Sequence, residues 1–85
     1  MKLKIYSIYD SKAQMYGQPF FQHNSAVCER SIRSMATGDT QYAKAPQDFT
    51  CYELGEYDDS TGIITSLESP LSVFTFNQFI GGNDA

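Results

Sequence analysis

The side chains that could do acid, base or nucleophilic chemistry are scattered along the chain and share no motif. His23 is the only histidine, and no serine, cysteine or carboxylate follows it at the spacing of a nucleophile and its base. Cys28 and Cys51 lack the paired C-x-x-C spacing of a zinc site, so we expect two free, buried thiols. We therefore expect no catalytic residue, no metal site and no cofactor, and a protein that is not an enzyme.

Two other stretches resemble ligand loops only superficially. Asp58-Asp59-Ser60-Thr61-Gly62 lacks the alternating oxygen ligands and the distal glutamate of a calcium loop, and we predict a turn there. Gly81-Gly82 is not followed by Lys-Ser/Thr, so it is no phosphate loop. The ten acidic side chains are interpreted as solvated surface, because spacing alone does not bring two carboxylates to one pocket.

The remaining constellation is basic and aromatic. Sequence-tolerant single-strand binders hold bases on aromatic rings of a sheet and hold the backbone with flanking cations. The candidate nucleic-acid-binding residues are Lys2, Lys4 and Tyr6 on one face of a predicted strand, and Arg30 and Arg33 on a predicted helix. A structural interpretation stays open, in which the lysines protect a sheet edge and the arginines only solvate or pair with Glu29.

Size and charge limit how DNA could be bound. A chain of 85 residues forms one domain with a small core, which we place at residues 1–80, followed by a flexible tail at 81–85. Oligomerisation would supplement so small a core. The net charge of −4 argues against a broad phosphate-neutralising surface, so DNA binding must be local, rich in stacking, or assembled in a homo-oligomer.

Hydrophobic periodicity predicts a small α+β fold, with an antiparallel sheet of three to four strands and one helix packed on a face. The expected elements are a strand at 2–9, a loop or short edge element at 13–18, a short strand at 19–22, a helix from Asn24 or Ser25 to Ala36, a connection at 39–47, and a hairpin of 49–54 with 63–67. Residues 71–76 are either a last strand or the aromatic start of a short helix through Ile80. Gly38 is expected to end the first helix in a left-handed conformation.

The same periodicity predicts which side chains are buried. On the first strand we expect Leu3, Ile5 and Ser7 to face inward and Lys2, Lys4, Tyr6 and Ile8 to face the partly exposed side. The predicted core consists of Leu3, Ile5, Cys28, Ile32, Met35, Phe49, Cys51, Ile63 and Leu67. The N-terminus lacks the apolar run and cleavage site of a signal peptide, and no segment reaches the length of a membrane span, so we expect a soluble, intracellular protein.

Short motifs recur in order over about residues 1 to 67. They are Tyr9-Asp10, Lys12-Ala13, Gly17-Gln18-Pro19-Phe20-Phe21, Asn24 with Ala26 and Arg30, Pro46-Gln47-Asp48-Phe49, Tyr52, Leu54-Gly55, Tyr57-Asp58 and Thr61-Gly62. In their order and spacing they resemble the small nonstructural protein of gokushoviruses, tailless single-stranded DNA bacteriophages of the Microviridae. The resemblance implies a DNA-binding protein that acts in the host bacterial cytoplasm while the single-stranded genome is replicated or packaged, and that is absent from the finished capsid.

Two hypotheses of different classes follow. In the first, the protein binds single-stranded phage DNA through the five basic and aromatic candidates. In the second, it is a non-enzymatic assembly factor whose exposed Tyr and Phe side chains build a homo-oligomer or dock on a phage or host replication protein.

Overall fold

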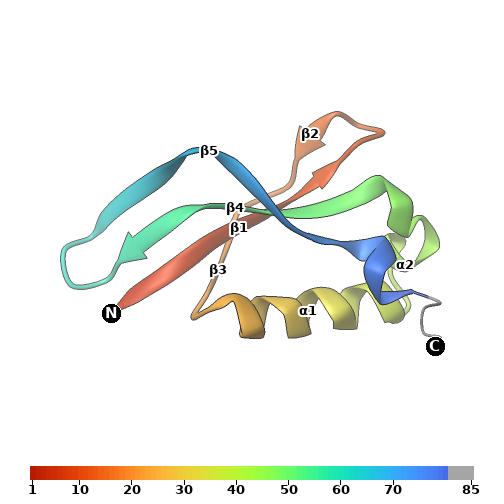
Figure 1. Cartoon of the computed structure of the whole chain (residues 1–85), viewed down its shortest axis with the longest axis horizontal. Helices are drawn as coiled ribbons and strands as arrows, with labels where there is room; N and C mark the ends of the chain where they lie inside the picture. The colour runs from red at the N-terminus through yellow and green to blue at the C-terminus, as the bar shows by residue number, and fades with distance from the viewer. Residues whose placement is uncertain (81–85) are drawn as a thin grey trace.

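The computed structural model describes residues 1–80 and has the expected α+β class (Figure 1). One curled antiparallel sheet has the strand order β2-β1-β4-β5, with β3 also paired to β1. The described part of the chain therefore has five strands rather than three to four, because β2 and β3 are short pieces that share one edge of β1. The elements are β1 (Lys2–Asp10), β2 (Met15–Tyr16), β3 (Phe20–Gln22), α1 (Ser25–Thr37), α2 (Gln41–Lys44), η1 (Pro46–Asp48), β4 (Phe49–Asp58), β5 (Ile63–Thr75) and η2 (Phe76–Phe79).

The helix α1 forms where the sequence predicts it. The Asn24 side chain accepts a hydrogen bond from the Val27 amide at 2.9 Å, which supplies a partner for one of the free amides of the first turn. Glu29 and Arg33 form the expected i,i+4 ion pair, at 3.0 Å. The prediction that Gly38 ends the helix in a left-handed conformation was wrong. Gly38 has a φ of −92°, so the helix ends in extended backbone.

The inward face of β1 is the opposite of the predicted one. Tyr6 and Ile8 join Cys28, Ile32 and Cys51 in the main core, against α1. Because side chains alternate along a strand, Ile5 and Ser7 lie on the other face, where they are nevertheless buried. Each set of alternate residues on β1 contains large apolar side chains, with Leu3 and Ile5 in one set and Tyr6 and Ile8 in the other, so the pattern alone did not decide which set would meet the helix.

Other core assignments have mixed outcomes. Ile5, Cys28, Ile32, Phe49 and Cys51 are buried as expected, and Met35 packs partly buried against the helix-side core. The prediction was wrong for the two expected core residues on β5, because Ile63 and Leu67 are 59% and 37% exposed. Figure 1 shows the reason, since the β4–β5 hairpin extends past the N-terminal end of α1 and no second layer covers it. The sequence-based core omitted Tyr6, Ile8 and Phe76, whereas Ala36 is buried as expected from its place on the apolar stripe of α1.

The hairpin is longer than predicted and irregular. β4 runs to Asp58, and β5 continues through Ser69-Pro70 to Thr75 as one strand. Gly55 pairs with Ser66 and Glu53 pairs with Leu71, so Leu67–Pro70 lie opposite Leu54 alone, and the middle of β5 rises away from β4 (Figure 1). A proline is tolerated in such an unpaired edge segment. Both alternatives for 71–76 are therefore partly right, because the strand ends at Thr75 and Phe76 begins the turn η2.

The segment 39–47, expected to be a plain connection, contains α2 and the start of η1. The predicted tail at 81–85 lies outside the described residues. Within residues 1–80, no helix is long and apolar enough to cross a membrane.

Candidate nucleic-acid interface

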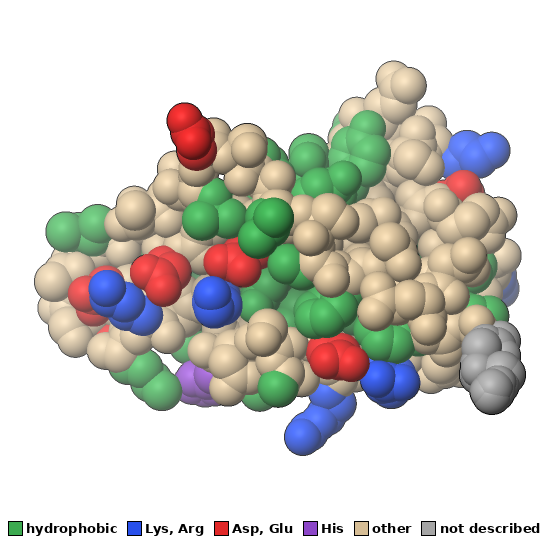
Figure 2. Space-filling view, in the orientation of Figure 1, with side chains coloured by type: hydrophobic (Ala, Val, Ile, Leu, Met, Phe, Trp, Pro, Cys, Tyr) green, Lys and Arg blue, Asp and Glu red, His purple; other side chains and the backbone are tan. Residues whose placement is uncertain are grey.

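The two candidate lysines of β1 lie among carboxylates. The Lys4 Nζ is 3.3 Å from Glu53 Oε2 on β4, and Lys2 pairs in register with Asp58. Glu56 and Asp58 line a shallow pocket together with Lys2. In the space-filling view of Figure 2, blue and red side chains are interleaved over this end of the sheet and form no basic patch. Phosphate groups would meet the acids as well as the lysines here.

Tyr6 lies inside the fold. It is fully buried, with its ring 6.0 Å from that of Phe20, and burial raises the pKa of its hydroxyl. A nucleobase cannot stack on a ring that has no accessible face. The place of Tyr6 is therefore in the core that supports the sheet, and a role in base stacking is excluded while the fold is intact.

This location leads to a first prediction. The Tyr6 hydroxyl is buried and has no hydrogen-bond partner among residues 1–80. Because an unsatisfied buried hydroxyl carries a desolvation cost, we expect Tyr6→Phe to leave the free energy of unfolding unchanged or to raise it by about 1 kcal/mol. Urea unfolding followed by circular dichroism measures the change. A loss of stability in Tyr6→Phe would contradict the prediction and show that the hydroxyl has a partner.

The candidate arginines lie on the exposed side of α1. Arg33 is engaged twice, in the ion pair with Glu29 and with its guanidinium 4.8 Å from the centroid of the Phe79 ring. Arg30 is exposed. The structure therefore brings Lys2 and Lys4 together on one strand and Arg30 and Arg33 together on one helix, with acidic residues mixed into both groups.

The opposite face of the sheet carries aromatic side chains that the candidate set omitted. Tyr9, Tyr16 and Tyr52, from three adjacent strands, form a cluster with ring centroids 4.8, 6.1 and 5.5 Å apart. Phe21 and Tyr57 form a second cluster, with ring centroids 5.8 Å apart. Alternation places all five on the face away from α1, because Ile8 and Cys51, which are next to Tyr9 and Tyr52, lie in the helix-side core. We call these five residues the aromatic face.

The aromatic face is accessible and carries few charges. Tyr16 and Phe21 are 43% and 46% exposed, and Tyr9, Tyr52 and Tyr57 are partly exposed. Apart from Glu68 of β5, the strand residues that alternate onto the same side are apolar or carry hydroxyls: Leu3, Ile5, Ser7, Thr50, Ile64, Ser66, Ser72 and Thr75. Ser7 is fixed by donating a hydrogen bond from its Oγ to the Gly17 carbonyl at 2.7 Å. Flat rings with few neighbouring charges suit planar, uncharged groups such as nucleobases, or the face of another protein.

The buried thiols are confirmed as free, with the two sulfur atoms 3.8 Å apart between α1 and β4. The contact with Cys28 and burial raise the pKa of Cys51, which keeps that thiol protonated. Cys28 and Cys51 are both inaccessible to solvent. Their place is in the packing between helix and sheet.

A cavity of about 470 Å³ lies between the β1–β2 turn and the α2 region. Phe20, Met35, Tyr42 and Phe49 contribute to its lining, and Asp10 is its one ionisable carboxylate. The Asp10 Oδ1 already accepts hydrogen bonds from the Lys12 and Ala13 amides. The cavity has the size of a small-ligand pocket, but the side chains that line it include no nucleophile paired with a general base.

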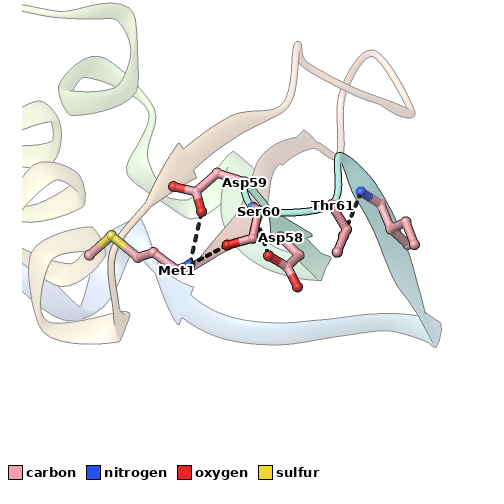
Figure 3. A network of polar contacts seen from close by, with 6 residues as sticks. Met1, Asp58, Asp59, Ser60 and Thr61 are labelled. Carbon is pink, nitrogen blue, oxygen red and sulfur yellow. Dashed lines mark hydrogen bonds and ion pairs between the residues drawn. The ribbon is translucent and has the colours of Figure 1, made fainter.

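The acidic stretch 58–62 is confirmed as a turn. The Asp58 side chain accepts a hydrogen bond from the Ser60 amide at 2.9 Å, and Gly62 has a φ of +77°. Figure 3 shows the Met1 nitrogen between Asp59 Oδ1, at 2.8 Å, and Ser60 Oγ, at 3.4 Å. Among residues 1–80, no group of three or more His, Cys, Asp or Glu side chains has a metal-binding arrangement.

Comparison with known families decides the affiliation. Residues 3–79 match the family described as Phage ORF5 protein. The chain belongs to this phage family. No curated protein and no solved structure matches it. The match covers all five strands and α1, so the whole sheet, including the aromatic face of this phage protein, belongs to the family domain.

Sequence reasoning missed the aromatic face of the phage protein because that surface depends on strand pairing. Tyr9 and Tyr52 are far apart in sequence and meet only through the register of β1 with β4. One signal was available: twelve Tyr and Phe residues are more than an 85-residue core needs, so several had to lie on the surface.

Proposed function

We propose that this phage protein binds single-stranded DNA by stacking nucleobases on the aromatic face. The role we assign is that of the gokushovirus nonstructural protein that it resembles, on the viral genome in the host cytoplasm during replication or packaging. No catalytic step is part of the proposal. Binding by stacking does not depend strongly on the DNA sequence, because every base has a planar face.

The observation that supports this proposal is the clustering of exposed rings across three strands. Each base stacked on such a ring contributes about 1 to 3 kcal/mol to binding. Phe21 lies opposite Ile5 and Tyr16 lies opposite Tyr9, four residues further along β1, so the two aromatic clusters are separated by about 13 Å at the usual rise per residue. A single strand crossing the sheet would meet both clusters.

The cations have a minor part in this proposal. Lys12, in the turn next to the Tyr9 and Tyr16 cluster, has no ion-pair partner among residues 1–80. Lys2, Lys4, Arg30 and Arg33 lie on the helix side of the sheet, so they stay candidates only for contacts with DNA that continues around the edge of the sheet. With one or two phosphates neutralised, the slope of log K against log salt would be only about −1.

The test compares two neighbouring residues of β2. Tyr16→Ala removes an aromatic-face ring, whereas Met15→Ala removes a 61% exposed side chain from the opposite face of the same strand. We expect Tyr16→Ala to weaken binding of a labelled single-stranded oligonucleotide by about 5-fold to 100-fold, from the loss of one stacked base, and Met15→Ala to bind as the wild type does. Fluorescence anisotropy at low and moderate salt measures both, with duplex DNA as the control.

Two results would contradict the proposal. One is the absence of binding by the wild type at low salt. The other is equal affinity of Tyr16→Ala and wild type, combined with a loss of binding in Arg30→Glu and Arg33→Glu, which would move the site to α1.

A second candidate function is that of a non-enzymatic assembly factor that contacts itself or a phage or host replication protein. The observation that favours it is the exposure of apolar side chains along β5. Ile63, Ile64 and Leu71 are 59%, 61% and 55% exposed.

A further inference from the structure

The outer edge of β5 is the longest unprotected strand edge in the described part of the chain. β5 has 13 residues, lies at the end of the strand order and pairs only with β4. Backbone amides and carbonyls along its other side have no strand partner, and such an edge is a template for pairing with a further strand.

The side chains of β5 lack the usual protection against that pairing. Exposed edges are commonly guarded by lysines or other inward-pointing charges. β5 contains one charged residue, Glu68, and no lysine. The segment Ile63–Leu67 that precedes Glu68 contains no charge and no proline, whereas Pro70 removes a donor from the later part of the strand.

We propose that the protein forms a homodimer in which Ile63–Leu67 of β5 pairs antiparallel with the same segment of a second copy. The residues of segment 63–67 favour a second copy as the occupant, because antiparallel self-pairing places Ile63 opposite Leu67 and no charge opposite another. The chain has a net charge of −4, so two copies repel each other over most of their surface, and the uncharged segment 63–67 lets their edges approach without placing like charges opposite each other. Antiparallel pairing about a two-fold axis is self-complementary, which the commonest oligomer symmetry requires.

The dimer would also cover apolar surface. Ile63 and Ile64 point to opposite faces of the strand, opposite Asp58 and Tyr57 respectively, and both are about three-fifths exposed in the monomer. Pairing of the two β5 segments places Ile and Leu side chains of one copy beside those of the other. The two five-stranded sheets then join into one, with both aromatic faces on the same side.

Light scattering coupled to size-exclusion chromatography tests this inference without DNA. We expect the wild type to shift from the 9.5 kDa monomer toward twice that mass as the protein concentration rises. Ile64→Lys should raise the dimer dissociation constant about tenfold or more, because the two lysines would be diagonal neighbours on one face of the paired strands and would replace apolar side chains that pairing covers. The matched control is Leu71→Lys, which makes the same change on the same strand at a similarly exposed position beyond Pro70, and it should dimerise as the wild type does.

Hydrogen exchange provides a measurement that does not depend on a variant folding. In the wild type, the amides of Ile63–Leu67 should exchange more slowly at high than at low protein concentration, while those of the exposed β1–β2 turn should not change. Three outcomes would overturn the inference: a wild type that stays monomeric at every concentration, a dimer with unprotected β5 amides, or equal weakening by Ile64→Lys and Leu71→Lys. A monomer whose β5 is protected only by another protein would assign this edge to a different partner.

Discussion

Replacing Gly55 with alanine should lower the free energy of unfolding by about 3 kcal/mol, the upper end of the usual cost of overpacking. A Cβ at this position would lie 2.8 Å from the Ser66 Cα and would also clash with the Thr65 carbonyl. Both obstacles are backbone atoms of β5, which cannot rotate away, so the strand itself would have to leave β4. Thermal and urea unfolding followed by circular dichroism measure the loss.

Gly17→Ala is the matched control for this change. Its Cβ would meet only the Ile8 carbonyl at 3.6 Å, an ordinary contact, and we expect a change of less than about 0.5 kcal/mol. If Gly55→Ala unfolded at the same urea concentration as Gly17→Ala, the close approach of β5 to β4 would be wrong.

The second large effect is expected for Phe76→Ala, which should cost about 3 to 5 kcal/mol. Phe76 is fully buried at the start of η2, with its ring 5.1 Å from Tyr42 and 6.0 Å from Phe49. It therefore joins three parts of the chain, α2, β4 and η2, in one aromatic cluster. A domain this small has only a few kcal/mol of stability to lose, so the variant should be largely unfolded at 37 °C.

Asn77→Ala separates this packing effect from any disturbance of the turn. Asn77 is the next residue of η2 and its side chain is exposed, so its loss should change stability by less than about 0.5 kcal/mol. Melting of Phe76→Ala at the wild-type temperature would show that the aromatic cluster does not hold η2 against the sheet.

Local signals made α1 predictable. Its cap, its buried stripe and its surface ion pair all depend on residues within a few positions of one another, and the Asn24 cap and the Glu29–Arg33 pair are both found. The β4–β5 hairpin was located for the same reason, since a turn at Asp58–Gly62 joins two runs with strand propensity. Its full length was not predicted, because Ser69-Pro70 interrupts the pattern of strand-forming residues in the sequence. In the structure, β5 continues through these two residues.

The long-range features were not predictable in this way. The helix-facing side of β1 depends on which of two apolar sets meets α1, and this is settled by Tyr6 and Ile8 fitting against Cys28 and Ile32. Leu54 is an extra residue where the register of β4 shifts, and it reverses the alternation from Glu53 to Gly55. Of the candidate site residues, Tyr6 was expected on a partly exposed face but lies in the core, and the aromatic face could be recognised only from the register of β1 with β4.

The strand order also constrains how the chain can acquire its structure. β1 is central in the sheet, yet Lys2 lies opposite Asp58, so the first strand to leave the ribosome finds its main partner only after most of the chain has been synthesised. Until then β1 has only the short pairings with β2 and β3. Folding dominated by such non-local contacts takes about milliseconds to seconds rather than microseconds. A nascent chain of this protein therefore carries the Ile and Tyr side chains of β1 without their main partner strand until β4 has been synthesised.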